Sequence, residues 1–295
     1  MPAYGEDERE SRILAESIRK FGGDDSSCPI WVMLPNGQIS EAARRALLAL
    51  DAQVFPFEID PAVLEFPFAG KVLAAAEAEV LAGDQTASLV WMDSDTILVG
   101  DATDLLLKEG ISLAYRPVMV TLISSLYDQP VDAFWEQVYR YCSVPPERAF
   151  ATTTVIDEKK IRAYFNAGLL AVRPDKGLLR AWRDNFIRLY LQADFQKFYQ
   201  EHDLYRIFAH QAILAGTALS QLERGEFYEL SSKYNFPIHL IDKLPTERRP
   251  KRLNDLVTCR YDVFERLASP EWRNSIRVEE PLLGWLDDQL SQPID

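Results

Sequence analysis

Two aspartates separated by one residue, Asp93 and Asp95, are the side chains in this sequence best spaced to do chemistry. They directly follow an apolar run, residues 89–92, which predicts a buried strand. Adjacent carboxylates repel each other, and hard oxygen ligands of this kind suit Mg²⁺ or Mn²⁺. In open α/β sheets, ligands bind at the carboxyl ends of the strands. We therefore expect a metal-bridged diphosphate site here; two solvated loop acids are the alternative that the spacing alone leaves open.

Composition narrows the classes of partner. The chain has 295 residues and a formal net charge of −13, which argues against nonspecific binding to nucleic acid or to an anionic membrane surface. No apolar run approaches the roughly 20 residues of a membrane span, and the polar, acidic N-terminus does not resemble a secretory signal. The three cysteines lie far apart without a CxxC pair, which favours reduced thiols. We expect a cytoplasmic protein.

The elements that must position the two aspartates alternate along the first half of the chain. Hydrophobic patterning predicts helices over 11–21, 41–50, 71–82 and 102–107, and strands over 29–34, 53–57, 89–92 and 111–116. Strands that alternate with helices favour an α/β fold with a mostly parallel, doubly wound sheet.

The second half is less regular. It predicts helices over 131–142, 178–190 and 206–219, an extended piece at 152–154 and a strand over 168–172. No repeat or linker marks a boundary, so we expect one domain over 1–295, with an irregular C-terminal part from about residue 243. The opening strand usual in nucleotide-binding α/β folds is not evident before the first helix; an upstream start or a substitute segment would account for it.

Four segments, in order, carry a family resemblance. The segment WMDSDT (91–96) resembles the DxD motif of GT-A-fold glycosyltransferases, which bind a nucleotide-diphosphate sugar through a divalent metal. YFNAGLL (164–170) is similar to a motif of the retaining, glycogenin-like members. HQAIL (210–214) resembles the start of their DQxxLN helix, and SKYNFP (232–237) resembles their LPxxYNFP segment. The whole chain is similar to bacterial proteins described as nucleotide-diphospho-sugar transferase-like.

The sequence also departs from that family. His210 stands where the family usually has Asp, and the late HxxGxxKPW motif, which supplies a third metal ligand and a phosphate-binding Lys, is absent. His239 is the only histidine late in the chain. It is a candidate metal ligand or a structural neighbour of the YNFP turn.

The resemblance implies a role for each site residue. Asp95 would coordinate Mn²⁺ or Mg²⁺, Asp93 would reach the metal or the donor's ribose, and Lys71 would face the donor phosphates. A metal that bridges both phosphates would neutralise the leaving diphosphate. A solvated lysine in the first turn of a helix is the alternative for Lys71.

Two amide side chains are the predicted catalytic residues. Asn166 would hydrogen-bond sugar hydroxyls, and Gln211 would point from a helix N-terminus toward the sugar. Gly168 would leave room for the donor. The alternatives are an Asn that satisfies a turn and a Gln on a helix surface.

These observations predict an enzyme: a hexosyltransferase-like glycosyltransferase that uses a UDP- or GDP-sugar and an acceptor that the sequence does not identify. A noncatalytic GT-A homologue that binds a nucleotide sugar is one alternative. A phosphatase of the haloacid-dehalogenase type is another, since Asp93 to Ile97 nearly match its DxDx[TV] nucleophile loop.

Overall fold

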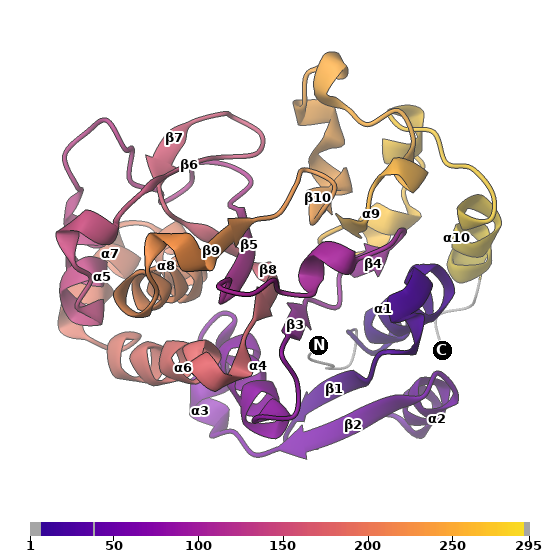
Figure 1. Cartoon of the computed structure of the whole chain (residues 1–295), viewed down its shortest axis with the longest axis horizontal. Helices are drawn as coiled ribbons and strands as arrows, with labels where there is room; N and C mark the ends of the chain where they lie inside the picture. Colours follow the sequence, from indigo (N-terminus) through magenta and orange to yellow (C-terminus); the bar gives the residue numbers. More distant parts are fainter. Residues whose placement is uncertain (1–6, 38, 292–295) are drawn as a thin grey trace.

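Small sheets surrounded by helices make up the chain in the computed structural model, which describes residues 7–37 and 39–291 (Figure 1). The strands are β1 (Ile30–Pro35), β2 (Ala52–Phe57), β3 (Leu89–Met92), β4 (Thr96–Leu98), β5 (Leu113–Pro117), β6 (Ala151–Thr153), β7 (Lys160–Arg162), β8 (Phe165–Val172), β9 (Phe227–Glu229), β10 (Phe236–Pro237) and β11 (Thr258–Arg260). The α-helices are α1 (Asp7–Phe21), α2 (Glu41–Ala49), α3 (Pro61–Leu64), α4 (Ala69–Ala82), α5 (Ala133–Cys142), α6 (Leu178–Leu189), α7 (Ala193–Glu201), α8 (Asp203–Gln221), α9 (Phe264–Ala268) and α10 (Leu282–Ser291).

The central sheet has the strand order β3-β8-β5-β9. All eight residues of β8 are buried, because the strand is covered on both faces. Leu170 and Val172 belong to the core that includes α8, whereas Leu169 and Ala171 belong to a second core with Leu98. Burial on both faces explains why this segment reads as a continuous apolar run without alternation.

The α/β class agrees with the sequence, but the sheets are mixed rather than mostly parallel. Four of the seven strand pairings among the described residues are antiparallel. β8 accounts for two of these pairings, because it runs antiparallel to both of its neighbours, β3 and β5. The expected helix over 102–107 is a single 3-10 turn, Thr103–Leu105.

A second sheet, β10-β11-β4, lies beside the central one and joins distant parts of the chain. β4, which begins directly after the two aspartates, pairs antiparallel with β11 from the C-terminal part of the chain. The segment after residue 243, expected to be irregular, contains several short 3-10 turns together with β11, α9 and α10. It packs its own apolar core, around Trp272 and Trp285, against α1.

β1 and β2 form a separate parallel pair. In the described part of the chain no strand pairing joins β1 to β3; a largely apolar cavity of about 390 Å³ lies between them. The helix α1 is the first described element. The residues before it, 1–6, in which an opening strand would have to lie, are outside the described residues.

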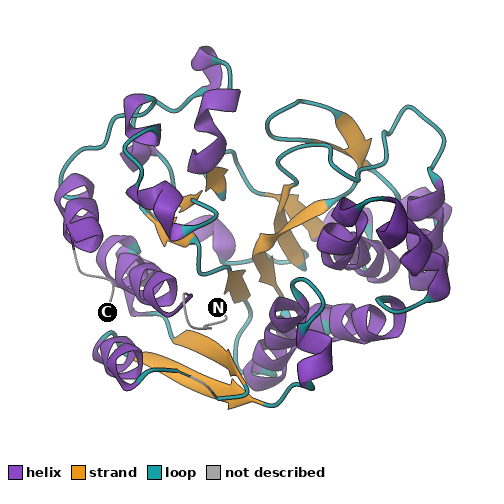
Figure 2. Ribbon diagram, turned by 180° about the vertical axis from the view of Figure 1, so that it is seen from behind, coloured by secondary structure: helices purple, strands orange, loops and turns teal. Residues whose placement is uncertain are grey.

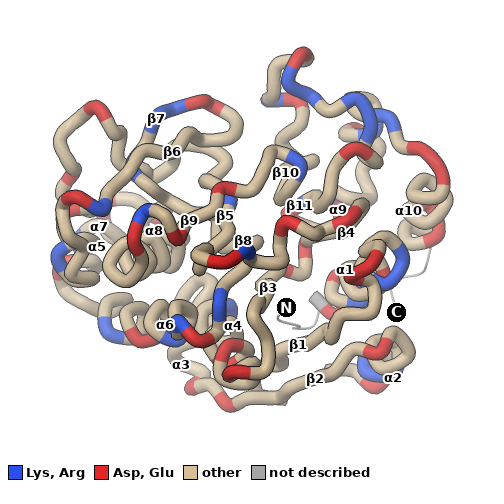
Figure 3. Tube along the Cα trace, viewed as in Figure 1, with Lys and Arg blue, Asp and Glu red and all other residues tan. Residues whose placement is uncertain are grey.

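Charge is spread over the whole molecule. Figure 3 shows acidic and basic positions interleaved along most elements, with a basic run between β10 and β11. Among the described residues, no helix combines the length and the apolar character needed to cross a membrane.

Helices pack around the outside of the strands (Figure 2), and the contact between α4 and α6 is held by a buried carboxylate. Glu79 of α4 is fully buried and accepts hydrogen bonds from the backbone N–H groups of Leu179 (3.0 Å) and Arg180 (2.9 Å). α6 has no side-chain cap of its own at Gly177. Glu79 therefore satisfies N–H groups that every helix N-terminus leaves open.

We predict that Glu79→Ala lowers the free energy of unfolding by about 2–4 kcal/mol, because it leaves two N–H groups and part of a guanidinium without their acceptor. Glu77→Ala is the matched control, since Glu77 lies on the same helix and pairs with Arg183 near solvent. Urea unfolding measures both. Equal, small losses for the two variants would contradict the assigned role of Glu79.

Candidate active site

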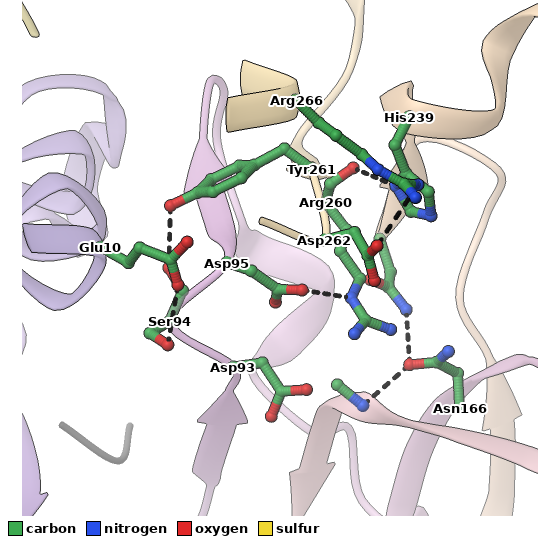
Figure 4. A network of polar contacts seen from close by, with 12 residues as sticks. Glu10, Asp93, Ser94, Asp95, Asn166, His239, Arg260, Tyr261, Asp262 and Arg266 are labelled. Carbon is green, nitrogen blue, oxygen red and sulfur yellow. Dashed lines mark hydrogen bonds and ion pairs between the residues drawn. The ribbon is translucent and has the colours of Figure 1, made fainter. Parts of the chain in front are cut away.

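The two aspartates lie in the tight turn between β3 and β4 (Figure 4). The N–H of Asp93 donates to the carbonyl of Gly168 at 2.9 Å, and the N–H of Tyr261 donates to the carbonyl of Asp95 at 3.0 Å. Each aspartate is only 6% exposed. Because a buried charge is costly unless it is paired, the turn requires cations close by.

Lys71, in the first turn of α4, supplies the first cation. Its Nζ lies 2.5 Å from Asp93 Oδ2, and both side chains are buried. The indole N–H of Trp91 donates to the other oxygen, Oδ1, at 3.1 Å. Each oxygen of Asp93 therefore accepts one hydrogen bond. Lys71 Nζ also lies 4.8 Å from the ring centre of Phe68, which is 42% exposed at the edge of the site.

Arg260, on β11, supplies the second cation. Its Nε donates to Asp95 Oδ2 at 2.8 Å. Burial lowers the pKa of Arg260, but the charges of Asp95 and Asp93 outweigh this and raise it above its ordinary value. Burial also raises the pKa of Asp95, and the Arg260 charge acts against that rise. Asp95 Oδ1 is buried and has no hydrogen-bond partner among the described residues.

The side-chain oxygen of Asn166 links the turn to two other motifs. Asn166 Oδ1 accepts the N–H of Gly168 at 2.8 Å and the side-chain amide of Asn235 at 3.1 Å. A Cβ on Gly168 would lie 2.9 Å from this oxygen and 3.1 Å from Asp93 Oδ2. Gly168 therefore allows the strand to pass directly beside the carboxylate, and three of the four segments quoted for the family meet at one place.

Gln211 lies well inside α8 rather than at a helix N-terminus, because the helix already begins at Asp203. Its Oε1 accepts the N–H of Ala167 at 3.0 Å, and its Nε2 lies 3.4 Å from the hydroxyl of Tyr164. Both ends of the amide thus hold the β8 segment. The neighbouring His210 is buried, with its ring 4.5 Å from that of Phe68. Burial, helped by the charge of Lys71, lowers its pKa well below the ordinary value.

His239 lies apart from the two carboxylates. Its Nδ1 is 3.1 Å from the carbonyl oxygen of Arg260, and Figure 4 shows its ring beside Arg266. Burial lowers its pKa to about 4. In this position the imidazole stabilises the backbone of the strand that carries Arg260.

The donor set does not fit a divalent cation as it is arranged. Of the four carboxylate oxygens of Asp93 and Asp95, only Asp95 Oδ1 lacks a partner in the described residues, so a cation would have to compete with Lys71, Trp91 and Arg260 for the other three. No group of three or more His, Cys, Asp or Glu side chains is placed to hold a metal within residues 7–37 and 39–291. The metal role assigned to Asp93, Asp95 and His239 stays a prediction.

The structure brings together Lys71, Asp93, Asn166 and Gly168, all of which the sequence predicted as site residues. It adds Arg260, which the sequence analysis did not predict. The sequence feature that indicates Arg260 is its position as the one charged residue in the largely apolar run LVTCRY (256–261). This run lies in the C-terminal part that was expected to be irregular. As it stands, the arrangement offers N–H donors from two cations beside two acids. Such donors bind anions with several oxygens, phosphates above all.

The comparisons with known proteins point to one family. The family model described as "Rhodobacterales glycosyltransferase domain" matches residues 4–207. This match confirms the resemblance to glycosyltransferases found in the sequence motifs. No curated protein matches the chain.

Several solved structures are similar to the chain. They include mouse xyloside xylosyltransferase 1 (13% identity, TM-score 0.40, covering 79% of this chain and 82% of that one), the glycosyltransferase GlyE of Streptococcus pneumoniae TIGR4 (14%, 0.46, 97% and 62%) and core-mannan synthase A of Aspergillus fumigatus, solved in an Mn/GDP form (6%, 0.45, 78% and 71%).

We predict that Gly168→Ala lowers the free energy of unfolding by about 1–3 kcal/mol, because the added methyl group forces Asn166 or Asp93 to move. Gly225→Ala is the control, since a Cβ there meets nothing within 4 Å. Thermal unfolding compares the two variants. A Gly168→Ala protein as stable as the control would contradict the close packing described here.

We also predict that His239 makes the protein less stable in mild acid. Its pKa of about 4 in the folded chain lies below the value of about 6.5 in an unfolded chain, so the unfolded state binds the proton more readily as pH falls below 6.5. Between pH 7 and pH 5, the free energy of unfolding of the wild type should fall by about 1–2 kcal/mol more than that of His239→Gln. Urea unfolding of both proteins at both pH values measures this. Identical losses in wild type and His239→Gln would contradict the prediction.

Proposed function

The chain belongs to the Rhodobacterales glycosyltransferase domain family, and we propose that it transfers a sugar from a UDP- or GDP-sugar to an acceptor hydroxyl. In that step the acceptor oxygen forms a bond to C1 of the sugar, and the hydroxyl proton is released. The bond between C1 and the β-phosphate oxygen breaks, with its electron pair left on the nucleoside diphosphate. The group that must be stabilised is therefore the departing diphosphate.

The observation that carries this proposal is the pair of cations at the end of β3, of which Lys71 is buried and Arg260 partly buried. Lys71 and Arg260 each bind one carboxylate of the DxD turn and keep further N–H groups that no described residue accepts. Positive groups fixed where negative charge develops stabilise a transition state without having to reorganise. We place the donor diphosphate against these two side chains.

The sugar would lie beside Asn166 and Gly168. The oxygen of the Asn166 amide is already occupied, but its Nδ2 donates to no described residue and is available to a sugar hydroxyl. Gly168 supports this place from behind, because its lack of a Cβ lets the side chains of Asn166 and Asp93 lie directly against the strand. Gln211, predicted to be catalytic, is bound at both ends, and we propose that it acts by holding Ala167 and its neighbours in place.

The divalent cation predicted from the sequence takes no step in this proposal, because most of the carboxylate oxygens that would bind it are occupied. The two alternative functions, a noncatalytic nucleotide-sugar binder and a phosphatase, have no observation in their favour. Release of UDP or GDP from a panel of UDP- and GDP-sugars, followed by chromatography, tests the proposal. Binding of a donor without any release of nucleotide would favour the noncatalytic alternative.

We predict that Lys71→Ala weakens the binding of UDP or GDP by about 10- to 100-fold, the loss expected for one charge-assisted contact of about 1.4–3 kcal/mol. Binding of the matching nucleoside, which has no phosphate, should change little. Calorimetric titration measures both. Lys160→Ala is the control, since that lysine pairs with Asp128 in solvent. Equal losses for nucleoside and nucleotide would rule out a phosphate contact at Lys71.

A further inference from the structure

We propose that Arg260 takes the place of a divalent cation at the donor diphosphate, and that the DxD aspartates orient Arg260 and Lys71 instead of binding a metal. This inference rests on the proposed nucleotide-sugar donor. It assigns a phosphate-binding role to a residue outside the 4–207 segment that the family model matches, and it makes donor binding independent of Mg²⁺ and Mn²⁺.

The first support is how the guanidinium of Arg260 is bound. Only its Nε donates to a described residue, Asp95, at 2.8 Å, although the group has five N–H donors. The Nη groups donate to no described residue. Figure 4 shows them directed toward the space near Asp93 rather than into the β11 strand. The Nη groups form the fork that frequently binds a carboxylate or phosphate in bidentate fashion, and here they are left for a ligand.

The second support is the rigidity of the strand that carries Arg260. β11 pairs antiparallel with β4 in a register that places Arg260 opposite Thr96, the residue directly after the DxD turn. The carbonyl of Arg260 is close to the His239 ring, and the N–H of the next residue, Tyr261, donates to the carbonyl of Asp95. The guanidinium is therefore fixed relative to the two aspartates before any ligand arrives.

The third support is the state of the carboxylates. Asp93 accepts from Lys71 and Trp91, and Asp95 Oδ2 accepts from Arg260. A metal that used both carboxylates through both of their oxygens would have to displace Lys71, Trp91 and Arg260. A diphosphate needs no such exchange, because a planar guanidinium and an ammonium group both bind phosphate oxygens directly.

The test is calorimetric titration of UDP and of GDP into the full chain, once with EDTA and once with Mn²⁺. We expect one of the two nucleotides to bind in EDTA with an affinity that Mn²⁺ changes by less than about threefold, a difference below 1 kcal/mol. Binding that requires Mn²⁺ would overturn the inference and leave the proposed function standing. No binding of either nucleotide in either buffer would contradict the proposed function, and this inference with it.

Two variants distinguish the two possible roles of the DxD turn, which are to orient Arg260 or to bind a metal. Arg260→Gln should weaken binding in EDTA at least about tenfold, the loss of one charged phosphate contact. If Asp95 binds a metal instead, the same variant frees its oxygens and strengthens binding with Mn²⁺, which would overturn the inference. Since Arg260→Gln leaves Asp95 buried without its cation, the double variant Arg260→Gln/Asp95→Asn keeps the test valid by replacing the ion pair with two neutral amides. It should lose binding as well.

Arg266→Gln is the matched control. Arg266 lies close by on α9, but it is half exposed and pairs with Asp262. The Arg266→Gln variant should bind UDP or GDP with the affinity of the wild type. A loss in this variant equal to that in Arg260→Gln would show a general charge effect and would overturn the specific role of Arg260.

Discussion

Burying two negative charges one residue apart is the constraint on which the rest of the structure depends. Asp93 and Asp95 leave solvent at the end of β3, and each would be costly there without a cation. The compensation comes from opposite ends of the chain: Lys71 from the helix before the strand and Arg260 from a strand near the C-terminus. Two otherwise separate sheets are thereby joined at one turn.

The uncharged part of the site follows from the same crowding. Gly168 is required beside Asp93 because any side chain would meet the carboxylate. Its N–H and the amide of Asn235 converge on one oxygen of Asn166. Segments that look independent in the sequence are therefore one hydrogen-bonded unit, and a change in any of them moves the others.

How much of this could be predicted from the sequence depended on distance along the chain. Lys71, Asp93 and Gly168 were found because each stands at a readable boundary, a helix start or a strand end. Arg260 was not, because strand pairing between β4 and β11 leaves no local pattern in either segment. The mixed sheet was missed for a similar reason: burial on both faces of β8 gives the apolar run of a parallel strand, although its neighbours run the opposite way.

The pairing of β4 with β11 also sets the order in which the molecule can be completed during synthesis. Arg260 leaves the ribosome 165 residues after Asp95, so a nascent chain that already contains the whole central sheet still holds an uncompensated aspartate. At that stage the carboxylate of Asp95 has no guanidinium to pair with. β11 is the last strand in the described part of the chain, so its pairing with β4 is among the last contacts that complete the turn.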